Sequence, residues 1–179
     1  MYKRQVLGFV FDADASVKSQ AAAVKAKLHS RTWALERLKK CGLSEKDLVK
    51  VYKTSIRSVA EYVSVIWHSM LTDEQSDLLE RQQNQALKMI SGPKMSARKM
   101  RARAGINTLK ERRVEACRKF VVTASKSPRF CQWFTQRPPS NYERRTGIEY
   151  NRVVEKICHS GCCYNSPIYF YRRLLNNSE

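Results

Sequence analysis

Lysine and arginine side chains, which bind phosphate groups in proteins, are concentrated in one part of this sequence. Residues 92–137 include 13 basic and 2 acidic residues, which gives this stretch alone a net charge of +11. Neutralising nucleic-acid phosphates releases their counterions, so a dense field of cations is typical of proteins that bind the nucleic-acid backbone. A basic helix face kept only for solubility is the alternative, but +11 exceeds what solubility requires. We predict a binding surface made of Lys94, Arg98, Lys99, Arg101, Arg103, Lys110, Arg112, Arg113, Arg118 and Lys119.

A second group of residues, near the C-terminus, has the chemistry of zinc ligands. Cys158, His159, Cys162 and Cys163 carry thiol and imidazole groups, which hold Zn²⁺ when four of them converge with tetrahedral geometry. No histidine follows Cys163, and the other three thiols of the chain are remote in sequence. We therefore expect plain thiols here, with structural zinc as the alternative.

Acidic residues that could hold a catalytic metal are not arranged for that purpose. Two-metal nucleotidyl transfer needs clustered carboxylates, and no adjacent Asp-Asp pair occurs in the chain. Asp12 and Asp14 come directly before a predicted helix, where acidic residues are ordinary. We expect no catalytic residue and no cofactor in this chain.

Composition limits the class of protein. The 179 residues include 34 basic and 16 acidic ones, a net charge of +18, and 42% are hydrophobic. With only 6 Gly and 5 Pro, this is neither a collagen nor a low-complexity chain. No apolar run approaches 18 residues, and no signal peptide is recognisable, so we expect no membrane association and an intracellular protein with reduced cysteines.

The spacing of apolar residues predicts two long helices in the first 70 residues. The first helix ends before Gly42, and the second begins after Ser44, with Asp47 three residues later as a variant capping pair. The first helix is expected to bury Val17, Val24, Leu28, Leu35 and Leu38, and the second Leu48, Val51, Tyr52, Ile56, Val59, Val63 and Ile66 or Trp67.

Two capping boxes predict the starts of two further helices. Thr72 with Gln75, and Thr108 with Glu111, match the S/T-x-x-E/Q pattern. The first of these helices runs to about position 90, before a Gly-Pro pair, and a short helix over 97–104 ends at Gly105. The helix that begins after Thr108 is predicted to carry these residues on its apolar side: Leu109, Val114, Cys117, Phe120, Val121 and Ala124.

The two ends of the chain differ from this helical pattern. Residues 6–11 (VLGFVF) are typical of a buried strand or one arm of a hairpin. The apolar run 168–175 predicts a short helix docked on the body, after a proline-containing linker at 138–139.

Aromatic residues fall into two groups. Tyr52, Tyr62 and Trp67 recur at helical spacing, so we expect them in the core. The second group lies among arginines, and its members either stack on bases or pack in the core: Phe130, Trp133 and Phe134.

The order of these motifs resembles a known family. The strings around Leu7-Gly8-Phe9, VYKTSIRSVAEYVSVIW (51–67), QNQALKMISG (83–92), GINTLKERR (105–113) and NSPIYFYRRLLN (165–176) resemble the reverse transcriptases of non-LTR retrotransposons, downstream of the catalytic palm. The resemblance covers residues 6–176 in order. Each motif is weak alone, and the series carries the specificity.

The resemblance implies a role without catalysis. Leu7 and Gly8 correspond to the end of the palm near the primer grip, and the helices after them to the thumb. The family's aromatic-Ala-Asp-Asp motif lies upstream of this point, so Mg²⁺ belongs to the intact parent enzyme and this chain is expected to be inactive alone. Its partners would be RNA, DNA or an RNA–DNA hybrid, together with the missing palm and fingers. The parent element would act in nucleus and cytoplasm.

These arguments predict a mainly α fold: a helical thumb-like bundle with one short N-terminal β-strand or hairpin, then a basic helical extension. We expect the end of the palm and the thumb helices in 6–92, a basic helical segment in 93–137, and a linker and tail in 138–179. Residues 1–5 (MYKRQ) match a translated sequencing adapter and are set aside as an artefactual start, with a natural basic N-terminus as the alternative.

Three other functions remain open at this stage. The chain could be an independent helical nucleic-acid-binding protein that reads bases through a recognition helix. It could be a helical module that docks a protein partner through apolar contacts. It could also be a decayed copy of a mobile element without a present function.

Overall fold

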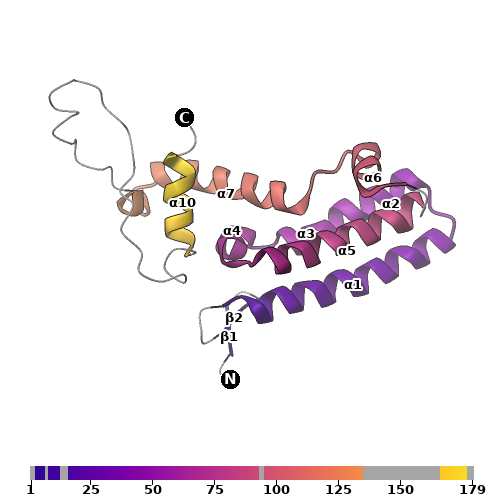
Figure 1. Cartoon of the computed structure of the whole chain (residues 1–179), viewed down its shortest axis with the longest axis horizontal. Coiled ribbons are helices and arrows are strands. Elements are labelled where there is room, and N and C mark those ends of the chain that lie inside the picture. The colour runs from indigo at the N-terminus through magenta and orange to yellow at the C-terminus, as the bar shows by residue number, and fades with distance from the viewer. Residues whose placement is uncertain (1–2, 7, 13–15, 93–94, 135–165, 177–179) are drawn as a thin grey trace.

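A computed structural model describes residues 3–6, 8–12, 16–92, 95–134 and 166–176, and most of these residues are helical, as predicted. The helices are stacked (Figure 1): α1 (Lys18–Lys40) lies along one side, α5 (Asp73–Ser91) lies in the middle with the helices that precede it, and α7 (Leu109–Lys126) lies on the other side. No helix within the described ranges has the length and apolar character needed to cross a membrane.

A two-stranded antiparallel hairpin precedes α1. Strands β1 (Lys3–Val6) and β2 (Phe9–Asp12) pair with Val6 opposite Phe9. Gly8 lies between the two strands with φ of +78°, a conformation that favours glycine. The predicted strand is therefore divided between the two arms of a hairpin, which was the predicted alternative. The buried side chain of Phe9 anchors the hairpin to the bundle. Strand β1 includes Lys3–Gln5, three of the five residues set aside as an artefactual start.

Helix α1 follows the prediction closely. It buries Val24, Leu28 and Leu35, and the chain leaves it through Gly42, which has φ of +87°. This apolar face packs along α5, and the two helices run in the same direction (Figure 1).

The predicted second helix is divided into five pieces. They are α2 (Glu45–Val51), the π-helical turn η1 (Tyr52–Ile56), α3 (Arg57–Glu61), α4 (Ser64–Trp67) and the 3₁₀ turn η2 (His68–Met70). Its start is as predicted, because the Ser44 hydroxyl accepts a hydrogen bond from the Asp47 N–H at 3.2 Å. The break between α3 and α4 lies at Val63, whose φ of +52° is left-handed and rare for a β-branched residue.

The π turn changes which side chains enter the core. A π turn holds one more residue than an α turn, so the positions that follow it in α3 are shifted by one residue around the helix axis. The structure buries Ala60 completely and Val59 only partly. After the break at Val63, α4 buries Ser64 and Trp67. The prediction that Val59 contacts the core is confirmed, although its side chain is only partly buried, whereas Val63 lies at the break in the helix. Of the two alternatives Ile66 and Trp67, the structure buries Trp67, which is 0% exposed.

The remaining helices begin and end where the capping residues predict. Both capping boxes are present, at the starts of α5 and α7. Helix α6 (Ala97–Ala104) begins after Ser96 and ends at Gly105 in the left-handed conformation. The last predicted helix is α10 (Pro167–Asn176), and a 3₁₀ turn, η3 (Cys131–Phe134), follows α7.

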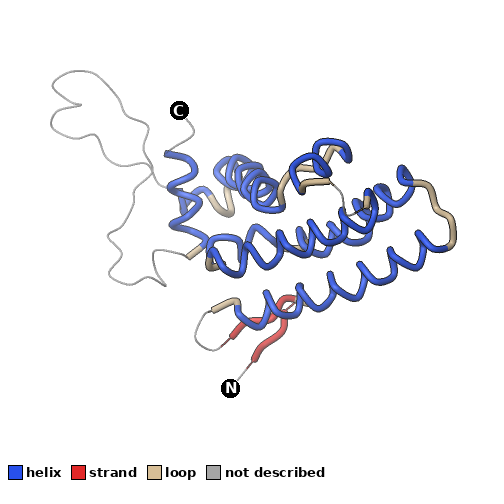
Figure 2. The backbone as a smooth tube through the Cα atoms, turned by 45° about the vertical axis from the view of Figure 1, so that its right-hand side comes forward, coloured by secondary structure: helices blue, strands red, loops and turns tan. Residues whose placement is uncertain are grey.

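Two hydrophobic cores hold these elements together. The larger one lies between α1, the α2–α4 segment, α5 and α6. The smaller one joins the end of α7 to η3 and α10, through Cys117, Val121, Phe134 and Tyr171. Figure 2 shows α10 crossing beside α7 at the end of the molecule opposite α6. The predicted docking of this last helix is therefore confirmed.

Candidate nucleic-acid interface

Six of the ten predicted phosphate-binding residues have exposed side chains. They lie on α6 and α7, the two helices of the basic segment: Arg98, Lys99, Arg103, Lys110, Arg118 and Lys119. Lys94 lies outside the described residues. The other three, Arg101, Arg112 and Arg113, are at least partly buried and make contacts within the protein.

Three of the six exposed cations have a carboxylate partner. Arg103 pairs with Glu45 at 2.8 Å, and Lys110 and Lys119 have longer contacts of 3.7 and 3.5 Å with acidic residues. Ion pairs in this exposed position contribute at most about 1 kcal/mol, so a phosphate can replace the carboxylate at little cost.

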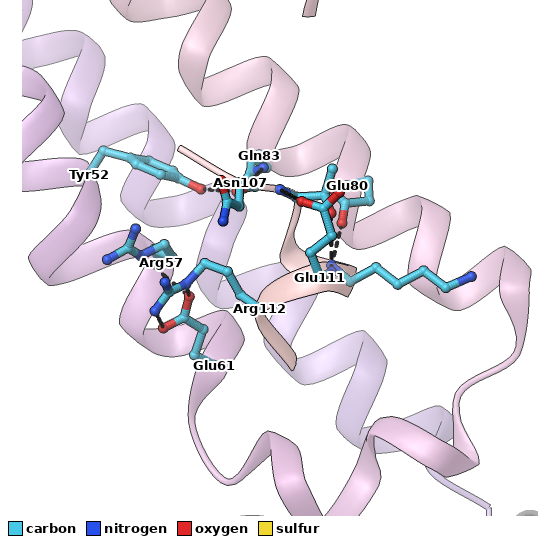
Figure 3. Close-up of polar contacts among 10 residues, drawn as sticks. Tyr52, Arg57, Glu61, Glu80, Gln83, Asn107, Glu111 and Arg112 are labelled. Atoms are coloured by element: carbon cyan, nitrogen blue, oxygen red, sulfur yellow. Dashed lines mark hydrogen bonds and ion pairs between the residues drawn. The ribbon is translucent and has the colours of Figure 1, made fainter. Parts of the chain in front are cut away.

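Arg112 of α7 and Arg101 of α6 each bind a side chain of a neighbouring helix. Arg112 forms a two-pronged ion pair with Glu61 of α3, and Glu61 also contacts Arg57 at 3.4 Å (Figure 3). The Glu61 carboxylate, as a hydrogen-bond acceptor, raises the pKa of Arg112. Arg101 donates a hydrogen bond of 2.9 Å to Asn84 of α5. These contacts position α6 and α7 on the bundle and leave both arginines less free to bind a ligand.

The prediction for Arg113 is wrong, because its side chain is 0% exposed. It donates a hydrogen bond of 2.7 Å to the Ser76 hydroxyl, and its guanidinium lies 5.9 Å from the ring centre of Trp67. Position 113 belongs to the buried face of α7, one turn from Leu109 and one from Cys117. Arg113 therefore joins α7 to the bundle and cannot contact a phosphate.

His68 lies beside this buried cation. The Arg113 Nε donates to His68 Nδ1 at 3.4 Å, and the ring of Phe170 meets the imidazole edge to face at 5.3 Å. Burial, and then the charge of Arg113, lower the pKa of His68 to about 4. The imidazole is thus neutral at physiological pH, and its contacts are those of a packing residue.

A buried chain of hydrogen bonds holds the link between α6 and α7 (Figure 3). The Tyr52 hydroxyl donates to Gln83 Oε1 at 2.7 Å, and the Gln83 amide donates to the carbonyl oxygen of Asn107 at 3.1 Å. Burial raises the pKa of Tyr52, so its hydroxyl keeps its proton and remains a donor. This series of hydrogen bonds fixes the position of the basic helices, α6 and α7, on α5.

A groove between α5 and α6 contains two cations of α5, which lie two turns apart on one face of that helix. It is lined by Arg81, Asn84, Gln85 and Lys88 of α5 and by the first residues of α6 with their cap. Lys88 also lines a second depression, between the ends of α1 and α5, together with Lys40. Arg98 and Lys99 follow directly in the first turn of α6. We call this surface the basic band: Lys40, Arg81, Lys88, Arg98 and Lys99.

The start of α6 adds backbone donors to the basic band. Ser96 accepts a hydrogen bond from the Lys99 N–H at 3.4 Å, which caps one of the free N–H groups of the first turn. The other N–H groups there and the positive end of the helix dipole favour an anion. With the side chains of Arg81 and Lys88 across the groove, these donors suit a phosphate.

The sequence analysis missed Lys40, Arg81 and Lys88. The net charge of the segment that contains α5 does not reveal Arg81 and Lys88, because the acidic residues at the start of that helix cancel their charge. The signal that could have found them is the exposed stripe of α5, which is acidic at its first turns and basic at Arg81 and Lys88.

The aromatic predictions are partly confirmed. Tyr52 and Trp67 are buried in the larger core, as predicted, but Tyr62 is 52% exposed because it lies at the break after α3. Phe134 is buried in the smaller core, and Phe130 and Trp133 pack against it. The core interpretation of this second group is therefore the correct one.

The remaining predicted sites are only partly described. Gly8 lies in the exposed turn of the hairpin, and Leu7 lies outside the described residues, as do Cys158, His159, Cys162 and Cys163. Over the described ranges, no three His, Cys, Asp or Glu side chains come close enough to hold a metal ion.

Comparisons with known proteins add no assignment. No protein-family model matches the chain, and neither a curated protein nor a solved structure shows significant similarity to it. The function must therefore be argued from the geometry and charge of the surface described above.

Proposed function

We propose that this chain grips the sugar–phosphate backbone of a nucleic-acid duplex without reading its sequence. The observation that carries the proposal is the basic band, where two depressions that share Lys88 lie between α1, α5 and the start of α6. Phosphate contacts position a protein on a duplex, whereas base-edge contacts give specificity. The band offers lysines, arginines and backbone N–H groups, which are phosphate-binding groups.

The role that fits this surface is that of a thumb in a non-LTR retrotransposon reverse transcriptase. The resemblance of residues 6–176 to that family supports this role, and so does the mainly helical bundle after a short hairpin. In the intact enzyme the palm and fingers would supply the Mg²⁺-binding carboxylates. This chain would contribute duplex binding only.

A salt titration tests duplex binding by the full chain. We expect an RNA–DNA hybrid and unrelated DNA duplexes to bind similarly, with log affinity falling steeply against log salt concentration. Each lost phosphate contact lowers the slope by about one. The double variant Arg81→Gln, Lys88→Gln should therefore reduce it by about two. The matched control is Lys126→Gln, an exposed lysine at the other end of α7 from α6.

Each other outcome points to a different function. If the Arg81→Gln, Lys88→Gln variant and the Lys126→Gln control change the salt slope equally, the basic band is not the duplex-binding surface. Binding confined to one sequence would favour an independent regulator. A folded chain that binds no duplex, judged by circular dichroism, would leave the protein-docking module.

The family role has a separate test at the level of the gene. In the genome, the reading frame upstream of the codon for Gly8 should encode an aromatic residue followed by Ala-Asp-Asp. An upstream frame that lacks this motif would contradict the reverse-transcriptase role and leave duplex binding untouched.

A further inference from the structure

Trp33 is a large aromatic side chain on the surface of α1. It is 59% exposed, whereas Trp67 is fully buried and Trp133 packs against the smaller core. A tryptophan on a helix can bury its ring against the bundle, as Trp67 at the end of α4 does. The exposed ring of Trp33 therefore contributes little to folding and is available to a ligand.

The residues one turn from Trp33 along α1 are His29 and Ser30 on one side and Glu36 and Arg37 on the other. The Arg37 guanidinium lies 5.1 Å from the ring centre, one turn towards the C-terminus. On the N-terminal side, the same face carries the exposed small residues Ala26 and Ser30. Because the Arg37 guanidinium lies over the ring, a flat ligand would approach from the side of Ala26 and Ser30.

The Trp33 face continues into the basic band. Lys40, one turn beyond Arg37, pairs with Glu36 at 3.1 Å and lines the depression that it shares with Lys88. A nucleic-acid strand bound to the basic band at Lys40 and extending along α1 would thus contact Arg37 and then Trp33.

The charge of α1 decides which partner fits this face. The helix carries seven basic residues and one acidic residue (Lys18, Lys25, Lys27, Arg31, Arg37, Lys39 and Lys40 against Glu36), a net charge of +6. Two copies of such a helix repel each other, and a polyanion is attracted. In a duplex the bases are stacked inside, so an exposed ring can stack only on an unpaired base.

We propose that Trp33 and Arg37 bind single-stranded RNA or DNA, with the indole ring stacked on an unpaired base and the guanidinium on its phosphate. This site is separate from the duplex contacts of the basic band and does not depend on them. It gives the chain a way to hold a single-stranded extension beside a duplex.

Tryptophan fluorescence of the full chain tests the proposal with two probes of equal charge. Oligo(dT) should quench the emission of the exposed Trp33 on binding. A single strand of the same length with abasic sites has the phosphates without the bases, and we expect it to bind more weakly and to quench little. Equal quenching by both probes would show that the ring stacks on no base.

Variants then locate the site. Base–aromatic stacking contributes roughly 1–3 kcal/mol, so Trp33→Leu should weaken oligo(dT) binding by about 5- to 100-fold and abolish the quenching. Tyr62→Leu, which removes an aromatic side chain 52% exposed elsewhere, should leave both unchanged. Circular dichroism confirms that each variant is folded. Unchanged affinity in folded Trp33→Leu would overturn the proposal.

Two further measurements separate other occupants of this face. A blue shift of Trp33 emission with phosphatidylserine vesicles and none with oligo(dT) would make it a membrane contact. A dimer in sedimentation that Trp33→Leu dissociates would make it a self-association surface. Loss of duplex binding in the basic-band variant, with oligo(dT) quenching retained, would leave this proposal standing, because the two sites are tested by different probes.

Discussion

The hydrogen bond between Tyr52 and Gln83 offers a sharp test of how the basic helices are held. Both side chains are almost fully buried, at 1% and 2% exposure, and the hydroxyl lies 2.7 Å from the amide oxygen. The Gln83 amide in turn donates a hydrogen bond to the carbonyl oxygen of Asn107, in the link between α6 and α7. The substitution Tyr52→Phe removes the hydroxyl and leaves the Gln83 oxygen buried without its donor.

The expected cost follows from that unsatisfied oxygen. A buried polar group without a partner costs about 1–3 kcal/mol, which is more than the net contribution of one hydrogen bond. Gln83→Met should cost a similar amount, since it leaves the Tyr52 hydroxyl buried while the exposed Asn107 can turn to water. The double variant has apolar groups on both sides. It should therefore be destabilised by about 1–2 kcal/mol less than the sum of the two single variants.

Urea unfolding followed by circular dichroism measures the free energy of unfolding of each variant. Gln85→Met is the matched control, because Gln85 lies two residues away on the exposed side of α5. We expect it to change stability by less than about 0.5 kcal/mol. Additive costs of Tyr52→Phe and Gln83→Met, or a neutral Tyr52→Phe, would refute the argument, because the two groups would then not be coupled.

Three further predictions concern other buried groups and a helix start. His68 in the unfolded chain takes up a proton near pH 6.5, but in the folded chain only near pH 4, so lowering the pH across this range should destabilise the protein. The free energy of unfolding should fall by at most about 3 kcal/mol, and by about 1–2 kcal/mol once the partial exposure of the ring is considered. Urea titrations at several pH values measure this fall, which should vanish in His68→Gln and persist in His29→Gln. Burial raises the pKa of the Cys117 thiol to about 12, so iodoacetamide at pH 8 should modify the exposed Cys131 and spare Cys117 until urea unfolds the chain, as mass spectrometry would show. Thr108→Ala removes a capping box and should lower the free energy of unfolding by about 1 kcal/mol, and an unchanged urea midpoint would contradict this.

Local signals in the sequence were sufficient for the ends of most helices. A capping threonine and a terminating glycine act within one turn, so Thr72 and Gly105 could be interpreted without knowledge of distant contacts. The same holds for the apolar face of α1, where the spacing of Leu28 and Leu35 alone indicates the buried side.

The tertiary structure decided which side chains face inward where the helix is irregular. The π turn after Tyr52 moved full burial from Val59 to Ala60, and a 3.6-residue pattern cannot foresee an inserted residue. Arg113 resembles its charged neighbours in sequence, but its position on α7 lies against α5, so it is buried.

The candidate surface depended on both levels. The sequence by itself determined that the chain is strongly basic and mainly helical, because net charge and apolar spacing are properties of the residues. Only the tertiary structure brought Lys40 and Lys88 to one depression and the start of α6 to the next, since these residues lie on three helices and α5 packs against both of its neighbours. Charge is additive along a chain, whereas the electrostatic field at a binding site depends on distances that the fold sets.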